Sequence, residues 1–184
     1  VTSLDIKNGN FNKLLLSLFG FIHILYLLHF IFKIYHLNLQ QGHSTDSGVF
    51  LCFWVVIIAI NTDIAGYIFG KLFGKNKLSI ISPKKTIEGA IGGIAFATFV
   101  GLILVLSFTH LLPTELNLWK ALIILIPLSI VSIASDLIES AFKRHAGQKD
   151  SGNLIPGLGG IFDLSDSIIL TAPLAYLLIK FFIF

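Results

Sequence analysis

Long apolar runs alternate with short polar segments along the chain. A helix needs about 20 mostly apolar residues to cross a bilayer. Five runs reach that length, and they cover residues 14–35, 49–70, 87–112, 119–142 and 163–184. The pattern therefore predicts an all-α integral membrane protein with about five transmembrane helices.

The composition agrees with a membrane protein. Apolar residue types make up 55% of the chain and charged types 12%, whereas soluble domains carry about 25% charged residues. With a mean hydropathy of +0.87, the chain is neither a soluble globule nor disordered. The lone Cys52 excludes an intrachain disulfide and a cysteine-based metal cluster. We expect one polytopic membrane domain over residues 1–184, truncated at its N-terminus because the chain contains no methionine.

The basic residues predict how the helices are oriented. Most of them lie before the first run, between the second and third, or between the fourth and fifth, at Lys7, Lys13, Lys71, Lys75, Lys77, Lys84, Lys85, Lys143, Arg144 and Lys149. The connections 36–48 and 113–118 contain no Lys or Arg. Basic loops stay in the cytoplasm, so we expect a cytoplasmic N-terminus in a cell (inner or plasma) membrane. The net charge of +3 is then a topology signal, and no nucleic acid partner is expected.

Acidic residues are scarce but concentrated in the apolar runs. Six of the ten lie inside or at the edge of a predicted span, namely Asp63, Glu88, Asp136, Glu139, Asp163 and Asp166. Each ionised carboxylate near the bilayer centre costs about 3 kcal/mol on insertion, so these groups require cations or backbone donors as partners. Structural pairing with lysines is one interpretation. A functional site is favoured because all six lie toward the predicted cytoplasmic side, beside the basic loops.

Four of these acids form two pairs with helical spacing. Asp136 and Glu139 are three residues apart and share a helical face, and Asp163 and Asp166 repeat this spacing at the start of the last run. Mg²⁺ in proteins takes one or two carboxylates together with phosphate oxygens and water. The pairs predict a site that binds Mg²⁺ with a phosphorylated substrate.

The segment 82–89 is suited to an anionic group. Ser82 can cap a helix that begins at Pro83, and Lys84 and Lys85 then lie at the helix start, where free amides favour anions. A basic anchor for anionic lipid explains the same residues equally well.

A glycine-rich segment precedes the last run. Gly157, Gly159 and Gly160 permit backbone amides to approach a phosphate closely. A flexible turn would also explain these glycines, but the preceding Arg144 and Lys149 favour anion binding.

These segments together resemble the signature of the phosphatidate cytidylyltransferase family, whose members are also called CDP-diacylglycerol synthases. The resemblance rests on residues 135–144 (SDLIESAFKR), 149–150 (KD) and 156–166 (PGLGGIFDLSD), with further blocks at 82–89 (SPKKTIEG) and 63–70 (DIAGYIFG). It implies a nucleotidyltransferase that makes CDP-diacylglycerol and pyrophosphate from CTP and phosphatidate at the cytoplasmic side of the membrane. Membrane lipid is a further expected partner, and a homodimer is one alternative for the oligomeric state.

The resemblance also implies roles for individual residues. Asp136 and Asp163 are expected as the main Mg²⁺ ligands, with Glu139 and Asp166 as second ligands; two carboxylate pairs match two divalent ions. Phosphate groups of the substrates are expected to bind Lys143, a further catalytic residue, and the substrate-binding residues Ser82, Lys84, Lys85, Arg144, Lys149, Gly157, Gly159 and Gly160. Asp63 and Glu88 would complete the polar wall of the pocket.

Two positions depart from the family pattern. Leu158 stands where the family commonly has His, and Leu164 where it commonly has Arg. A CTP-dependent polyprenol or phytol kinase, a cytidylyltransferase acting on isoprenoid lipids and an inactive membrane scaffold are alternatives. An ion transporter is a weaker one, because its acids would be staggered across the bilayer.

Overall fold

The computed structural model describes residues 10–79, 81–145 and 161–184, although not every side chain at the start of its first and last helices. Five long helices make up most of this part of the chain: α1 (Asn10–Gln40), α2 (Thr45–Phe73), α3 (Ile87–Ser107), α4 (Leu118–His145) and α5 (Ile161–Phe182). A short 3-10 helix, η2 (Thr109–Leu111), follows α3. The all-helical class predicted from the apolar runs is confirmed.

Four helices are long and apolar enough to cross a membrane within the described residues. They are α2, α3, α4 and the portion Ser165–Phe182 of α5. The expected span 14–35 lies within α1, many of whose side chains fall outside the described part, so the count of five stays a prediction.

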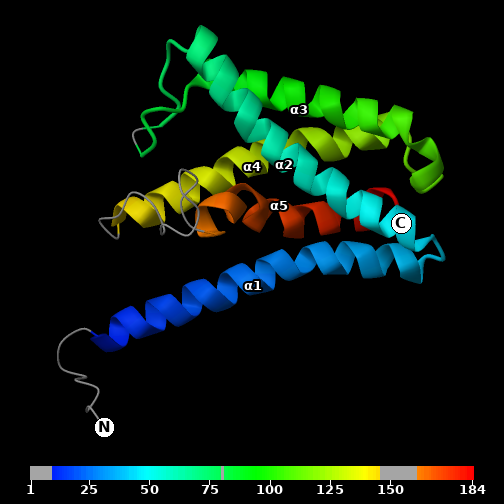
Figure 1. Cartoon of the computed structure of the whole chain (residues 1–184), viewed down its shortest axis with the longest axis horizontal. Helices are drawn as coiled ribbons and strands as arrows, with labels where there is room; N and C mark the ends of the chain where they lie inside the picture. The colour runs from blue at the N-terminus through cyan, green and yellow to red at the C-terminus, as the bar shows by residue number, and fades with distance from the viewer. Residues whose placement is uncertain (1–9, 80, 146–160) are drawn as a thin grey trace.

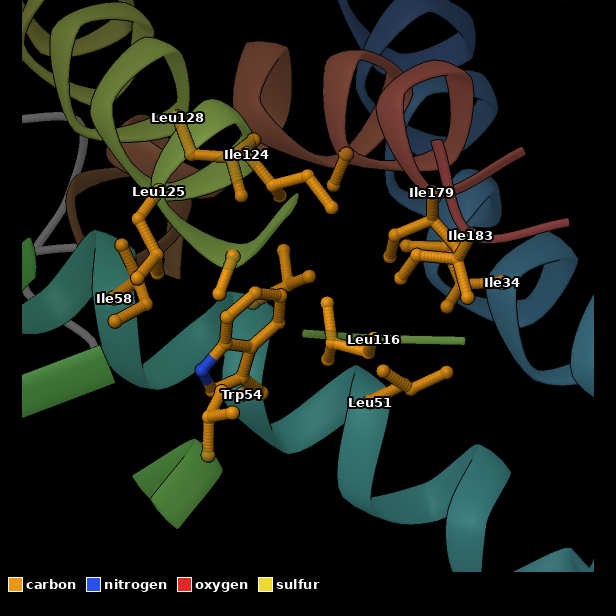
Figure 2. Packing of buried hydrophobic residues seen from close by; sticks show 14 of the residues in the cluster. Ile34, Leu51, Trp54, Ile58, Leu116, Ile124, Leu125, Leu128, Ile179 and Ile183 are labelled. Carbon is orange, nitrogen blue, oxygen red and sulfur yellow. The ribbon is translucent and has the colours of Figure 1, made fainter. Parts of the chain in front are cut away.

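Helix α2 is central to the packing. It crosses over α4 and α5 (Figure 1) and contacts each of the other long helices, with its largest interface on α3. The core lies where these helices meet, and Figure 2 shows Trp54 and Ile58 of α2 facing Leu125 of α4. The Trp54 indole also donates a hydrogen bond to the Gly101 carbonyl of α3 (3.1 Å).

Helices α2 and α3 approach one another through glycines. A Cβ atom placed on Gly89 would lie 2.5 Å from the Gly66 carbonyl oxygen, and one on Gly93 would lie 2.7 Å from the Thr62 carbonyl oxygen. No side chain fits at either distance, so the two backbones are in direct contact here. This contact positions Asp63, in the same turns of α2, close to the start of α3.

The start of α3 agrees with the predicted apolar run 87–112 but not with the predicted cap at Ser82. Ser82 does not cap a helix at Pro83; instead its carbonyl accepts the Lys85 amide (3.0 Å) and closes a turn. Pro83 occupies the second position of that turn, which its fixed φ favours. The helix begins four residues later, where the Thr86 hydroxyl accepts the Gly89 amide (3.1 Å) as its N-cap.

The two ends of the helix bundle carry different charges. The α2–α3 loop, residues 74–86, lies at the same end as the C-terminus of α4 and the N-terminus of α5 (Figure 1). At the opposite end, His43 and Glu115 from the other two loops lie 3.7 Å apart. The basic α2–α3 loop and the basic end of α4 therefore share one end of the molecule, as the charge pattern predicts.

Candidate functional site

A pocket lined by both charged and apolar residues opens at the basic end, between α2, α3, α4 and the α2–α3 loop. Its volume is about 290 Å³. It is lined by Thr62, Asp63, Gly66, Tyr67, Leu78, Ser82, Lys84, Lys85, Thr86, Ala90, Ile133 and Asp136. Five of the residues predicted for the site thus meet around one cavity: Asp63, Ser82, Lys84, Lys85 and Asp136.

Asp136 of α4 is paired with a lysine from the α2–α3 loop. The Lys85 ammonium contacts the Asp136 Oδ2 directly, and both side chains are largely shielded from solvent. The Ser140 hydroxyl, one turn further along α4, donates to Asp136 Oδ1 (3.3 Å). The pocket therefore has a carboxylate and a cation in contact at its wall, which suits it to a ligand carrying both metal and phosphate.

Ser167 of α5 connects two further carboxylates. Its hydroxyl donates to Asp63 Oδ2 of α2 and lies 3.0 Å from Asp166 Oδ1. The Ser167 amide donates to the same Asp166 oxygen (2.7 Å). Asp63 and Asp166 thus belong to one cluster although they are far apart in the sequence, and both interact electrostatically with Asp136.

Ser135 fixes α4 against α5 beside this cluster. Its hydroxyl donates to the backbone carbonyl of Asp166 and accepts the Leu170 amide (3.3 Å). Only 3% of Ser135 is exposed. Because it binds backbone groups of α5, Ser135 fixes the position of Asp166 along the helix axes relative to Asp136. Asp136 is the residue that follows Ser135 in α4.

Glu139 is the most buried of the predicted acids whose side chains are described, at 4% exposure. The Lys143 ammonium lies 3.1 Å from its Oε1 atom, and Asp166 is close enough to interact with it. Its Oε2 atom has no hydrogen-bond partner among the described residues. A buried carboxylate oxygen without a donor favours a cation beside it.

Glu88 is placed differently from the other acids. Its carboxylate accepts hydrogen bonds from the backbone of the α2–α3 loop at Lys75 and Asn76. It is not among the residues that line the pocket.

Several predicted residues lie outside the described part of the structure. They are Lys149, Gly157, Gly159 and Gly160, together with the side chain of Asp163 at the start of α5. Arg144, in the last turn of α4, lines a second, open cavity of about 610 Å³ whose lining includes Pro83 of the α2–α3 loop.

The acids of this cluster are the predicted ligands of Mg²⁺. Within the described ranges, no three acidic, histidine or cysteine side chains are grouped closely enough to hold a metal ion by themselves. Mg²⁺ needs only one or two carboxylates when phosphate oxygens and water complete its shell. Asp136 and Asp166, with the unpartnered oxygen of Glu139, fit that more modest requirement, and the binding of Mg²⁺ stays a prediction.

Two serines were missed by the sequence analysis. Neither Ser135 nor Ser167 was predicted as a site residue. The available signal was a serine directly beside each acid pair, in Ser135-Asp136 and Asp166-Ser167. Their partners lie on other helices, so spacing along one helix could not identify them.

Comparison with known proteins gives consistent relatives. Residues 2–182 match the Cytidylyltransferase family. A phosphatidate cytidylyltransferase of Staphylococcus haemolyticus (strain JCSC1435) is 42% identical over 137 residues, which cover 74% of this chain and 51% of the relative. The protein of the same name from Staphylococcus epidermidis (strain ATCC 12228 / FDA PCI 1200) is 44% identical over the same shares. The chain therefore spans about half the length of these curated relatives.

Proposed function

Because the chain belongs to the cytidylyltransferase family, we propose that it transfers CMP from CTP to phosphatidate. A phosphate oxygen of phosphatidate attacks the α-phosphorus of CTP, and the bond from that phosphorus to the β-phosphate oxygen breaks. The products are CDP-diacylglycerol and pyrophosphate. The observation that carries the proposal is the pocket in which Lys84 and Lys85 face Asp63 and Asp136.

The residues in the pocket suit this chemistry. The attacking lipid phosphate is already anionic at neutral pH, so the reaction needs no strong general base. The main obstacle is repulsion between two polyanions, and positioned cations reduce that repulsion in the transition state. Lys85 and Lys84 supply fixed positive charge at the pocket wall, and Lys143 and Arg144 add charge at the end of α4.

The proposal includes Mg²⁺ bound by the acids of α4 and α5. Asp136 and Asp163 would be its main ligands, and Glu139 and Asp166 would be the second ligands. When bound, Mg²⁺ would neutralise charge on the phosphates. Ser167 and Ser135 would fix the acids in place, as their hydrogen bonds already do in the protein alone.

The location of the site follows from the same proposal. With the basic loops in the cytoplasm, the pocket faces the cytoplasmic surface of the membrane. This placement gives the site access to CTP from water and to phosphatidate from the adjoining leaflet.

The test is a product assay on the full chain purified in detergent. Labelled CTP, phosphatidate and Mg²⁺ should give CDP-diacylglycerol and pyrophosphate, and chelation with EDTA should stop the reaction. Asp136→Asn should lower kcat/KM by about 1000-fold, or about 4 kcal/mol, because it removes a carboxylate ligand of the Mg²⁺ that would neutralise the phosphates. Asp46→Asn is the matched control, since Asp46 is exposed in the first turn of α2 at the other end.

Three outcomes would contradict the proposal or part of it. Normal activity of the Asp136→Asn variant would refute the role given to that residue. Release of CDP, seen only when a lipid alcohol is supplied, would identify a kinase instead. Product from a longer version of the protein but none from this chain would show that further segments are required.

A further inference from the structure

We infer that Glu88 is a positioning residue that holds the α2–α3 loop in the conformation that directs Lys85 to Asp136. The inference rests on the proposed function, because it assigns the loop lysines to phosphate binding. Glu88 therefore has a role different from that of the acids in the pocket, although it was predicted to lie in the pocket wall with Asp63.

The Glu88 carboxylate is engaged on both oxygens by the far side of the loop. The Lys75 amide donates to Oε2 (3.1 Å), and the Asn76 amide lies 3.2 Å from both oxygens. The Asn76 side-chain amide donates to Oε1 (2.7 Å). Three donors on two adjacent residues thus converge on one carboxylate, and charged acceptors make the stronger class of hydrogen bond.

Further hydrogen bonds connect this anchor to Lys85. The Asn76 carbonyl accepts the Ile87 amide (2.9 Å), and the Leu78 amide donates to the Lys85 carbonyl (2.8 Å). Lys77 and Thr86 form an isolated antiparallel bridge between these two bonds. The strand-like segment that Glu88 holds is therefore paired directly with the segment that carries Lys85.

The N-terminus of α3 does not depend on Glu88 for its cap. Thr86 already caps the helix by accepting the Gly89 amide (3.1 Å). Besides a contact with its own backbone amide, the hydrogen bonds of the Glu88 side chain run outward to the loop at Lys75 and Asn76. Because Thr86 supplies the cap, their loss should free the loop while leaving α3 formed.

The Lys85 side chain provides a readout that needs no substrate. Its ammonium is paired with Asp136 and is 25% exposed as a side chain, so it should react slowly with an acetylating reagent. In the full chain in detergent, Glu88→Ala should increase the acetylation rate of Lys85 by about tenfold, the effect of one lost bond to a charged group. Lys120, at the start of α4, is the internal reference and should keep its rate.

Matched variants separate positioning from general damage. Glu88→Asp should restore part of the protection, and Asp46→Asn, in an exposed acid at the start of α2, should leave the Lys85 rate unchanged. Asn76→Ala removes a donor without altering α3 and should reproduce part of the increase even where Glu88→Ala fails to fold. An unchanged Lys85 rate in folded Glu88→Ala and Asn76→Ala would overturn the inference.

Steady-state kinetics give a second, independent test of whether Glu88 positions Lys85. A displaced Lys85 should raise the KM for one of the two phosphate-bearing substrates, whereas a smaller folded fraction would lower kcat and leave both KM values unchanged. The second pattern would contradict the inference. If the unmodified chain makes no CDP-diacylglycerol, the proposed function fails, and the acetylation rates still decide whether Glu88 positions Lys85.

Discussion

A single hydroxyl group, that of Ser167, joins carboxylates from two helices. The hydroxyl contacts Asp63 of α2 and Asp166 of α5, and Ser167 as a whole is 5% exposed. Groups that orient the ligands of a metal or phosphate site commonly matter about as much as the ligands themselves. The Ser167 hydroxyl oxygen therefore contributes both to the packing of α2 against α5 and to the proposed orientation of the acids.

Replacing Ser167 should damage the site more than replacing another buried serine. For Ser167→Ala, we expect a 10–100-fold increase in the Mg²⁺ concentration needed for half-maximal activity, a loss typical of residues that orient metal ligands. Ser129→Ala is the control, because that hydroxyl binds the Leu125 carbonyl of its own helix (3.0 Å). The measurement is a Mg²⁺ titration of CDP-diacylglycerol synthesis, and equal titration curves would contradict the orienting role.

Sequence patterns located the acids of the site better than their partners. Asp63 and Asp136 were predicted to face a common pocket, and the structure brings them to one. The bond from Ser167 to Asp63 joins residues 104 positions apart, and it depends on how α2 and α5 are packed. Periodicity predicts which residues share a face of one helix, but not which faces of different helices meet.

At the scale of elements, the contact between α2 and α3 determines the shape of the pocket. Glycines allow the two backbones to touch just below the α2–α3 loop, which holds the loop close to Asp63. The predicted run 49–70 lies within α2, and the prediction for α3 gave its first residue correctly at Ile87. The expected cap at Ser82 was wrong because Ser82-Pro83 can begin either a helix or a turn, and the local sequence does not distinguish the two.

Adding one methyl group at this interface should destabilise the protein. Gly89→Ala places a Cβ 2.5 Å from the Gly66 carbonyl oxygen, and overpacking of this kind costs about 1–3 kcal/mol. We expect a lower Tm in detergent, measured as the temperature at which the helical circular dichroism signal is lost.

The control for this substitution lies on the facing helix. A Cβ on Gly66 would lie 3.6 Å from the Gly89 carbonyl oxygen, an ordinary contact. Gly66→Ala should leave the Tm unchanged or raise it slightly, since alanine favours helix by about 1 kcal/mol over glycine. An equal decrease in Tm for both variants would contradict the inference that the interface is tighter at Gly89 than at Gly66.

At the scale of the whole molecule, charge separates the two ends of the bundle. The loop lysines and the basic end of α4 lie together, opposite the loops that carry His43 and Glu115. The sequence could predict this arrangement because the positive-inside rule needs only loop composition. It could not show that the basic loop also closes over the acids, since that contact depends on the hydrogen bonds of Glu88.

Orientation in the membrane can be tested with single cysteines. After Cys52→Ala, we expect Glu115→Cys to react with an impermeant maleimide on intact cells. Lys77→Cys, in the α2–α3 loop, should react only after the membrane is permeabilised. The reverse pattern would place the pocket on the outer side and contradict the proposed access to CTP.

The hydrogen bond between Ser167 and Asp63 has a consequence for biosynthesis. Helices leave the ribosome in chain order, so Asp63 enters the bilayer long before Ser167 has been made. Until α5 inserts, the Asp63 carboxylate of α2 lacks the Ser167 donor, and an unpaired carboxylate in the bilayer is costly. Insertion of α5 therefore supplies a partner to a carboxylate that is already in the bilayer, and we expect chains that stop before α5 to insert less stably than chains that include it.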